Sequence, residues 1–221
     1  MSIAKGWEWE KAKQSPWLKP SEDSYFLSWK WQEKKYKTIL DLGSGLGRHS
    51  ILFAKAGFQV SALDISDYGI NHLNEWAKLE NLIIDTKKGD MHKLPYEDNS
   101  FDCLFIYHAI SHTDTEGMKT IMKEVERVLK AGGELYTSMC SKSSMEYKSS
   151  NSTVLDKNTI VRNEEGPEKD VPHFYVDIED IIELFSNFQV EKVRHIDYCY
   201  MNDKKQNSKY YYINAIRNKS K

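Results

Sequence analysis

The sequence predicts an α/β fold, with a doubly wound and mostly parallel sheet that carries helices on both faces. From residue 38 onward, short apolar runs alternate with segments whose apolar residues recur at helical spacing, which is typical of a parallel sheet covered by helices. The run FDCLFIY at residues 101–107 is apolar almost throughout, as expected for a central strand that is buried on both faces. The last apolar runs, 189–200 and 210–217, flank a polar turn and predict an antiparallel hairpin at the sheet edge.

Each element begins and ends on a local signal. The parallel strands are predicted at residues 38–42, 59–64, 82–87, 101–107 and 134–139. Gly57 ends the first helix of this region (residues 47–56), Ser66 or Asp67 caps the second, and Asp177 caps the last. The clearest helical periodicity is carried by Met118, Ile121, Met122, Val125, Val128 and Leu129.

Two segments depart from this alternation. Residues 1–36 are rich in tryptophan and include a predicted helix from about Ser21 to Lys35, whose many apolar side chains must pack on another element. We interpret residues 1–36 as an aromatic helical lid segment, with simple packing against a flank of the sheet as the alternative. Residues 37–221 form the main domain. Within it, residues 141–173 are rich in Ser, Asn, Glu and Lys, which predicts an insertion or long mobile loop over the site.

Length and charge limit the class of protein. The chain has 221 residues and a formal net charge of −2, which fits one domain with no overall attraction to nucleic acid or to a membrane surface. The longest apolar runs are too short to span a bilayer, and the N-terminus lacks the apolar core of a signal peptide. The three cysteines are scattered without metal-ligand spacing. A cytoplasmic protein without a structural metal or disulfide framework is therefore expected.

A glycine-rich turn after the first strand is the most informative feature. Residues 39–47 read ILDLGSGLG, a helix is expected to start near Arg48, and Asp64 closes the next apolar run. Because glycines lack a Cβ, such a turn lets a ligand approach the backbone, and the helix N-terminus behind it offers unpaired N–H groups. Asp64 is placed to accept hydrogen bonds from both hydroxyls of a ribose. A nucleoside-like cofactor is therefore predicted.

The glycine spacing and the nearby charges bear on which cofactor binds. A dinucleotide-binding turn has the pattern G-x-G-x-x-G, whereas this turn reads G-x-G-x-G (Gly43, Gly45 and Gly47), and Arg48 takes the place of the third glycine. Asp41 would repel a pyrophosphate but attract an ammonium group, and S-adenosylmethionine has an ammonium group and no phosphate. The stretch ILDLGSGLGRHS resembles motif I of the class I S-adenosylmethionine-dependent methyltransferases, and ALDIS at residues 62–66 resembles their ribose-binding strand end.

The resemblance covers roughly residues 38–139 and the closing hairpin. It implies a Rossmann-like sheet of seven strands with S-adenosylmethionine as cofactor and S-adenosylhomocysteine as product. The stretch GDMHKLPYEDNSFDCLFIYHAISH resembles the block between the family's adenine-binding loop and its motif IV. The cofactor-binding residues implied are Asp41, Gly43, Ser44, Gly45, Gly47, Arg48, Asp64, Ile65, Ser66, Asp90, Met91 and Tyr107.

The resemblance also implies a role for several of these residues. Asp90 would accept from the adenine amino group, while Ile65 and Met91 would pack on the two faces of the ring. The segment around Tyr107 would lie beside the methionine tail, and Arg48 would pair with the carboxylate of that tail. As the alternative, Asp90 caps a turn and Arg48 is a solvated helix residue.

Methyl transfer from a sulfonium is an in-line displacement, so the protein mainly has to align and desolvate the nucleophile of the acceptor. A general base helps only where that nucleophile carries a proton. The candidates for acid/base or acceptor-positioning roles are His108 and His112 after the fourth strand and His173 and Tyr175 before the last helix. Further candidates for the lid or the acceptor end are Trp17, Tyr25 and Arg162.

The absence of several sequence motifs limits the class of methyl acceptor. The sequence has no Asn/Asp-Pro-Pro-Tyr after the fourth strand, no Pro-Cys nucleophile and no metal triad, so a small-molecule acceptor with an N, O, S or chalcogen nucleophile and no metal site are expected. The compact architecture is similar to the branch with tellurite-resistance and thiol or chalcogen methyltransferases. An NAD-type oxidoreductase and a non-catalytic S-adenosylmethionine-binding protein stay open. A monomer or homodimer is expected, with nucleic acid an improbable partner.

Overall fold

The computed structural model describes Trp7, Trp9 and residues 15–149, 151–163, 165, 168–199 and 207–219. The strands of its central sheet are β1 (Thr38–Leu42), β2 (Gln59–Asp64), β3 (Ile84–Lys88), β4 (Phe101–Ile106), β5 (Leu129–Ser141), β9 (Phe188–Cys199) and β10 (Asn207–Arg217). The helices are α1 (Glu22–Glu33), α2 (Arg48–Lys55), α3 (Asp67–Leu79), α4 (Thr115–Val128) and α5 (Ile178–Leu184), with short 3-10 turns at Ser15–Leu18 and Glu146–Lys148.

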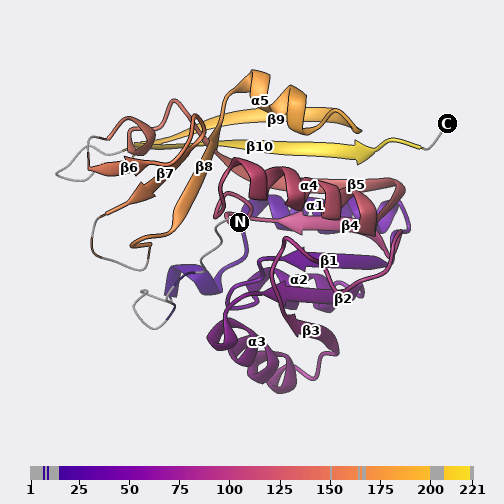
Figure 1. The fold of residues 1–221 in the computed structure, drawn as a ribbon. Coiled ribbons are helices and arrows are strands. Elements are labelled where there is room, and N and C mark those ends of the chain that lie inside the picture. Colours follow the sequence, from indigo (N-terminus) through magenta and orange to yellow (C-terminus); the bar gives the residue numbers. More distant parts are fainter. Residues whose placement is uncertain are drawn as a thin grey trace.

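The sheet runs in the order β3-β2-β1-β4-β5, and the pairs among these strands are parallel (Figure 1). β10 pairs antiparallel with the far edge of β5, and β9 pairs antiparallel with β10. The α/β fold with an antiparallel terminal hairpin is therefore confirmed. The predicted caps are also present: Ser66 accepts from the Gly69 N–H, and Asp177 forms a capping box with Asp180.

Helices cover both faces of the sheet. Successive side chains of a strand point to opposite faces, so Ile39 and Leu40 in β1 are both fully buried but belong to different cores. Leu40 lies in the core formed with α4 and α5, and Ile39 lies in the core formed with α1 and α2. The third core joins Leu73 of α3 to Ile51 of α2 and Ala62 of β2.

Residues 141–173, predicted to be an insertion or long mobile loop, contain two short strands and the start of a third instead. These are β6 (Ser152–Val154), β7 (Thr159–Arg162) and β8 (Pro172–Val176), which pair antiparallel in that order and bring the sheet to ten strands rather than seven. The sequence did not reveal them because each run is short and lies among residues that favour turns. Their pairing depends on a distant strand edge, which local patterns do not record.

β8 places this added hairpin beyond the end of β4. It pairs in parallel with β5 at Cys140 and Ser141, past Thr137, where the pairing of β5 with β4 stops. At Cys140, β10 pairs with one edge of β5. β8 therefore pairs with the opposite edge, which β4 occupies as far as Thr137. The Phe174 N–H also donates to the Ser111 carbonyl at 2.7 Å. The added strands therefore stand at the carboxyl end of the parallel strands, where open α/β sheets bind ligands (Figure 1).

A buried carboxylate on β5 holds α1 against the sheet. Glu134 is only 2% exposed, accepts from the indole N–H of Trp31 at 2.9 Å, and forms ion pairs with Lys30 and Lys34. Trp31 is itself fully buried against Phe53 of α2. The predicted need of this helix for a packing partner is thus met by the flank of the sheet.

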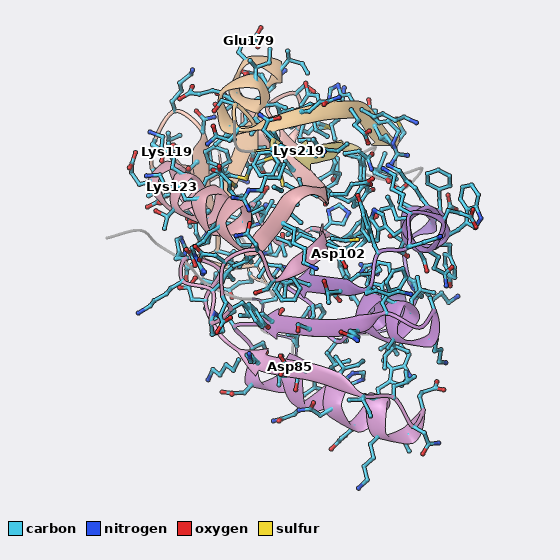
Figure 2. All side chains as sticks on the ribbon, turned by 90° about the vertical axis from the view of Figure 1, so that its right-hand side faces the viewer. Asp85, Asp102, Lys119, Lys123, Glu179 and Lys219 are labelled. Atoms are coloured by element: carbon cyan, nitrogen blue, oxygen red, sulfur yellow. The ribbon has the colours of Figure 1, made fainter. Side chains whose placement is uncertain are left out.

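The amino end of the sheet is closed by a second polar cluster. Asp102, labelled in Figure 2, lies in β4 and accepts from the backbone N–H groups of Lys37 and Thr38 at 2.8 and 3.0 Å. Lys130 pairs with its other carboxylate oxygen at 2.8 Å. These contacts join the start of β1 to β4 and to the start of β5.

Candidate functional site

The turn between β1 and α2 is fastened to the end of β2. The N–H groups of Gly43 and Ser44 donate to the Leu63 carbonyl at 2.8 and 3.1 Å. The Gly45 N–H donates to Oδ2 of Asp64 at 2.8 Å, and Oδ1 of the same carboxylate accepts from the Ser66 N–H at 2.8 Å. Asp64 therefore orders the turn and the start of α3 together, and its side chain still lines the adjoining cavity.

Two glycines allow the elements around the turn to approach it closely. Gly43 has a φ of +74°, and a Cβ at this position would lie 2.3 Å from the Cβ of Ala109. Gly69 of α3 was not predicted as a site residue. A Cβ there would lie 2.6 Å from the carbonyl oxygen of Gly45. Both glycines are therefore needed for the turn to keep its place between α3 and the segment after β4.

Asp41 faces away from the ligand space. Its carboxylate is 1% exposed and accepts from the Ser50 hydroxyl of α2 at 2.5 Å. Burial raises the pKa of Asp41 to about 7, against the opposing effects of the Ser50 hydrogen bond and the Arg48 charge. The predicted direct contact with a ligand ammonium group is therefore replaced by a hydrogen bond that holds α2 to β1.

We expect Asp41→Asn to change the dependence of stability on pH. The folded-state pKa lies above the ordinary value, so the wild type loses stability as the unfolded chain releases this proton, between about pH 4 and pH 7. A shift of roughly three pKa units corresponds to about 4 kcal/mol, and the asparagine variant should escape most of this loss. Urea unfolding of both proteins across this range measures it, with the exposed Asp85→Asn as control. A pH-independent difference between wild type and Asp41→Asn would contradict the expectation.

A cavity of about 410 Å³ opens beside the turn, a volume in the range of small-molecule sites. Most predicted cofactor-binding residues line it: Gly43, Ser44, Gly45, Arg48, Asp64, Ile65, Asp90, Met91 and Tyr107. Gly47 and Ser66 instead occupy the caps of α2 and α3, and Tyr175 contacts Tyr147 beside a smaller pocket. Tyr25, a candidate for the lid, is 55% exposed and does not line the cavity that the described residues form.

The side of the cavity next to β3 carries the predicted adenine contacts. Ile65 is 39% exposed and faces open space, and Met91 lines the same part of the cavity. The Asp90 carboxylate accepts from the His92 N–H at 2.9 Å and meets the His92 ring nitrogen Nδ1 at 2.5 Å. Asp90 thus caps its own turn, as the alternative interpretation expected, and it still borders the cavity.

The N-terminal segment contributes an aromatic wall. Trp7, Trp9 and Trp17 line the cavity, and their rings contact one another with centroids 4.8 to 6.0 Å apart. Arg48 joins this wall to the sheet, because its guanidinium lies over the rings of Trp17 and Tyr107 and donates to the Lys19 carbonyl at 3.1 Å. The wall closes the cavity over the glycine-rich turn.

His108 stands in a strained backbone conformation at the cavity wall. Its φ is +54°, and its N–H donates to the Ser138 hydroxyl at 2.8 Å. Its ring packs edge-on against Tyr107 and Tyr210, with centroids 4.3 and 4.4 Å away. Burial lowers the pKa of His108 to about 3, so the ring is neutral at pH 7 and weakly basic. This environment favours a positioning role over proton abstraction.

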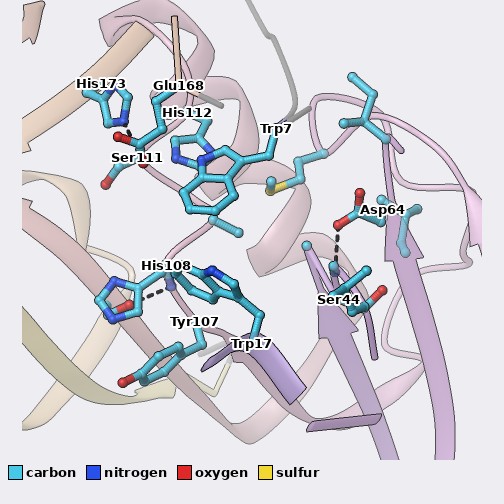
Figure 3. Close-up of a pocket in the computed structure, with 18 of the residues that line it drawn as sticks. Trp7, Trp17, Ser44, Asp64, Tyr107, His108, Ser111, His112, Glu168 and His173 are labelled. Carbon is cyan, nitrogen blue, oxygen red and sulfur yellow. Dashed lines mark hydrogen bonds and ion pairs between the residues drawn. The ribbon is translucent and has the colours of Figure 1, made fainter. Parts of the chain in front are cut away.

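The other two predicted histidines come together. The rings of His112 and His173 lie 5.1 Å apart, because the hydrogen bond from Phe174 to Ser111 brings β8 beside the segment after β4. Glu168, which the sequence analysis did not single out, joins them, and one candidate ligand atom from each of the three lies within 4.8 Å of the others. Burial lowers the pKa of His112 to about 3. Figure 3 shows this cluster at the opposite end of the cavity from Ser44 and Asp64.

Residues 40–137 match the family described as "Methyltransferase domain". The match spans the glycine-rich turn, Asp64 and the strands that hold them. Residues 40–137 therefore form a domain of the class I S-adenosylmethionine-dependent methyltransferase type. The predicted family and its cofactor are thereby confirmed.

Individual relatives agree with this family. A sterol 24-C-methyltransferase from Gibberella zeae is 34% identical over 98 residues, which are 43% of our chain and 25% of the relative. Our chain therefore spans about a quarter of the length of that curated relative. The structure is similar to an S-adenosylmethionine-dependent methyltransferase from Methanosarcina mazei, with a TM-score of 0.70 and 21% identity over 83% of our chain and 93% of the other.

The structure is also similar to 1,6-didemethyltoxoflavin-N1-methyltransferase from Burkholderia thailandensis, solved with 1,6-didemethyltoxoflavin and S-adenosylhomocysteine. The TM-score is 0.66 and the identity 13%, over 93% of our chain and 82% of the other. At such identities, these two structures support the fold of our chain.

Several residues of the cavity were not predicted from the sequence. They are His49, His92, Ser111, Cys140, Glu168, Tyr198 and Tyr210. Tyr210 and Cys140 reach the cavity because of the register in which β10 pairs with β5. A local sequence pattern does not specify the register between strands that are distant in the sequence. For Glu168 one signal was available, since a carboxylate five residues before His173 gives a pair of possible metal ligands.

Proposed function

We propose that this methyltransferase transfers the methyl group of S-adenosylmethionine to a small-molecule acceptor by in-line displacement. The observation that carries the proposal is the double anchoring of Asp64 by the N–H groups of Gly45 and Ser66. This arrangement orients a carboxylate at the cavity wall, and each of its oxygens keeps a lone pair with which to accept from a ribose hydroxyl.

The remaining contacts of the cofactor follow from the same orientation. Ile65 and Met91 would enclose the adenine ring, with Asp90 at its edge. Arg48 and the strand end at Tyr107 would bind the methionine tail, because the guanidinium can pair with the tail carboxylate. Asp41 would act indirectly, by holding α2 through Ser50.

The volume and wall of the cavity support a small acceptor. Its volume of about 410 Å³ lies in the range of small-molecule sites. The aromatic wall of Trp7, Trp9 and Trp17 would exclude water from the reacting atoms and so desolvate the nucleophile. We propose that residues 1–36 act as the lid of this site. Residues 1–6, 8 and 10–14 of that segment lie outside the described residues.

Two measurements test the proposal. Titration calorimetry should detect S-adenosylhomocysteine binding and no NADH binding, and methyl groups from labelled S-adenosylmethionine should appear in a fraction of a metabolite extract. NADH binding alone would favour the oxidoreductase. Cofactor binding without transfer to any metabolite fraction would favour the non-catalytic alternative. Transfer to RNA or protein in place of metabolites would contradict a small-molecule acceptor.

The cellular location and the oligomeric state of the protein were also predicted from its sequence. None of the helices in the described part of the chain has the length and apolar composition needed to cross a membrane. The cytoplasmic location and the monomeric or homodimeric state stay predictions from the sequence.

A further inference from the structure

The cluster formed by His112, Glu168 and His173 supports an inference that neither the family nor the sequence analysis supplied. We propose that these three side chains form a site for a divalent transition metal, such as zinc or iron(II), at the acceptor end of the cavity. The sequence analysis expected no metal site, because the three residues are scattered in the sequence and meet only through the pairing of β8.

The ligand set has the composition of known metal sites. Two imidazoles and one carboxylate bind zinc in several hydrolytic enzymes and iron(II) in non-haem oxygenases. The candidate ligand atoms lie within 4.8 Å of one another. Ligands about 2.0–2.2 Å from a tetrahedral zinc ion are roughly 3.4 Å apart, so closure needs side-chain movements of about 1 Å. Nε2 of His173 and Oε1 of Glu168 are already 3.6 Å apart.

The contacts of His173 indicate that a cation belongs between these groups. Its Nδ1 meets the Val171 carbonyl at 2.9 Å, and a carbonyl can only accept, so Nδ1 carries the hydrogen. The other ring nitrogen, Nε2, faces Oε1 of Glu168 at 3.6 Å and is buried without a hydrogen-bond partner. Two electron-rich groups that face each other in a buried site are stabilised by a shared cation.

Both anchoring ligands have the outer support that metal ligands usually have. The Val171 carbonyl orients the His173 ring, and Arg162 pairs with the second oxygen of Glu168 and leaves Oε1 directed at His173. Figure 3 shows His112 beside this pair, with the ring of Trp7 next to it. All three cluster residues line the cavity, so a bound metal would keep coordination positions open to it.

The use of such a metal rests on the proposed function. A metal at this end would bind an acceptor through an anionic oxygen, a nitrogen or a thiolate and so hold the nucleophile opposite the cofactor. The binding of the metal itself requires no methyl transfer and can be measured separately.

Metal-stripped protein titrated with Co²⁺ and Zn²⁺ tests the site. We expect roughly one equivalent of tightly bound metal and a visible absorption band of cobalt in a low-symmetry N/O site. Glu168→Gln and His173→Gln should weaken binding by about 100-fold or more, since even outer contacts of metal ligands are worth 10- to 100-fold. His195→Gln is the matched control, because His195 lies on β9 and does not line the cavity that the described residues form.

The outcomes separate the two proposals. The metal site is overturned if folded wild type takes up no stoichiometric Co²⁺ or Zn²⁺, or if Glu168→Gln takes up the metal equally well. Binding of S-adenosylhomocysteine to metal-free protein tests the cofactor site alone. A change in the cobalt spectrum on addition of acetohydroxamate, a small chelating anion, is expected if coordination positions are open. An unchanged spectrum would contradict the acceptor-holding role. If the variants do not fold, the cobalt spectrum of the wild type still decides.

Discussion

Asp64→Ala is expected to weaken binding of S-adenosylhomocysteine by more than about 100-fold. The carboxylate accepts from two backbone N–H groups and is proposed to accept from the ribose, and each hydrogen bond to a charged group is worth about 1.5–3 kcal/mol. Loss of two such contacts amounts to about 3–6 kcal/mol, or roughly 10²- to 10⁴-fold in Kd. Titration calorimetry at fixed pH measures the change.

Asp67→Ala is the matched control for this substitution. Asp67 is the first residue of α3, three positions from Asp64, and its side chain is 71% exposed in an ion pair with Lys88. Exposed pairs of this kind contribute about 0–1 kcal/mol, so the control should bind the cofactor product within a few-fold of the wild type. Equal effects of the two substitutions would show that Asp64 does not hold the ligand.

Gly43→Ala is expected to disrupt the turn and to abolish most cofactor binding. A left-handed φ costs a non-glycine residue about 1–2 kcal/mol, and the added Cβ would lie 2.3 Å from the Cβ of Ala109. Overpacking of this kind typically adds about 1–3 kcal/mol, so the free energy of unfolding should fall by about 2–5 kcal/mol. Urea denaturation and calorimetry with S-adenosylhomocysteine give the two readouts.

Gly57→Ala is the control that separates the steric clash expected in Gly43→Ala from the cost of a left-handed backbone. Gly57 follows α2 with a φ of +90°, but no atom lies within 4 Å of a Cβ placed there. Its substitution should lower stability by only the conformational cost of about 1–2 kcal/mol and leave cofactor binding unchanged. If Gly43→Ala proves no worse than Gly57→Ala, the close packing of the turn against Ala109 is not important for the site.

The arrangement of the glycine-rich turn beside Asp64 could largely be predicted from the sequence. The turn from Gly43 to Gly47 and the carboxylate of Asp64 each follow an apolar strand, and parallel strands bring their carboxyl ends to one edge. Asp41 was misjudged because alternation within β1 fixes only the face on which a side chain lies, and that face carries Ser50 of α2. Gly69 was overlooked because its contact with the Gly45 carbonyl joins two elements that are separate in the sequence.

The acceptor end of the cavity was predicted only in part. His112 and His173 were candidates but Glu168 was not, because residues 141–173 were expected to be a loop and only the pairing of β8 with β5 brings Glu168 and His173 to His112. Register between distant strands depends on backbone hydrogen bonds that are common to all residues, so the sequence of the segment does not specify it. The aromatic segment of residues 1–36 was interpreted as a lid over the pocket, and the rings of Trp7 and Trp9 do line the cavity.

By itself, the sequence determined the alternation of strands and helices, the parallel order that places a glycine-rich turn beside Asp64, and hence the class of cofactor. These features are local, because spacing, caps and glycines act within a few residues of one another. The tertiary structure alone decided which side chains line the end of the cavity opposite Asp64, because that depends on how the strands of residues 152–176 pack beyond the end of β4. Docking of this kind sums weak contacts over long sequence separations, which no short pattern encodes.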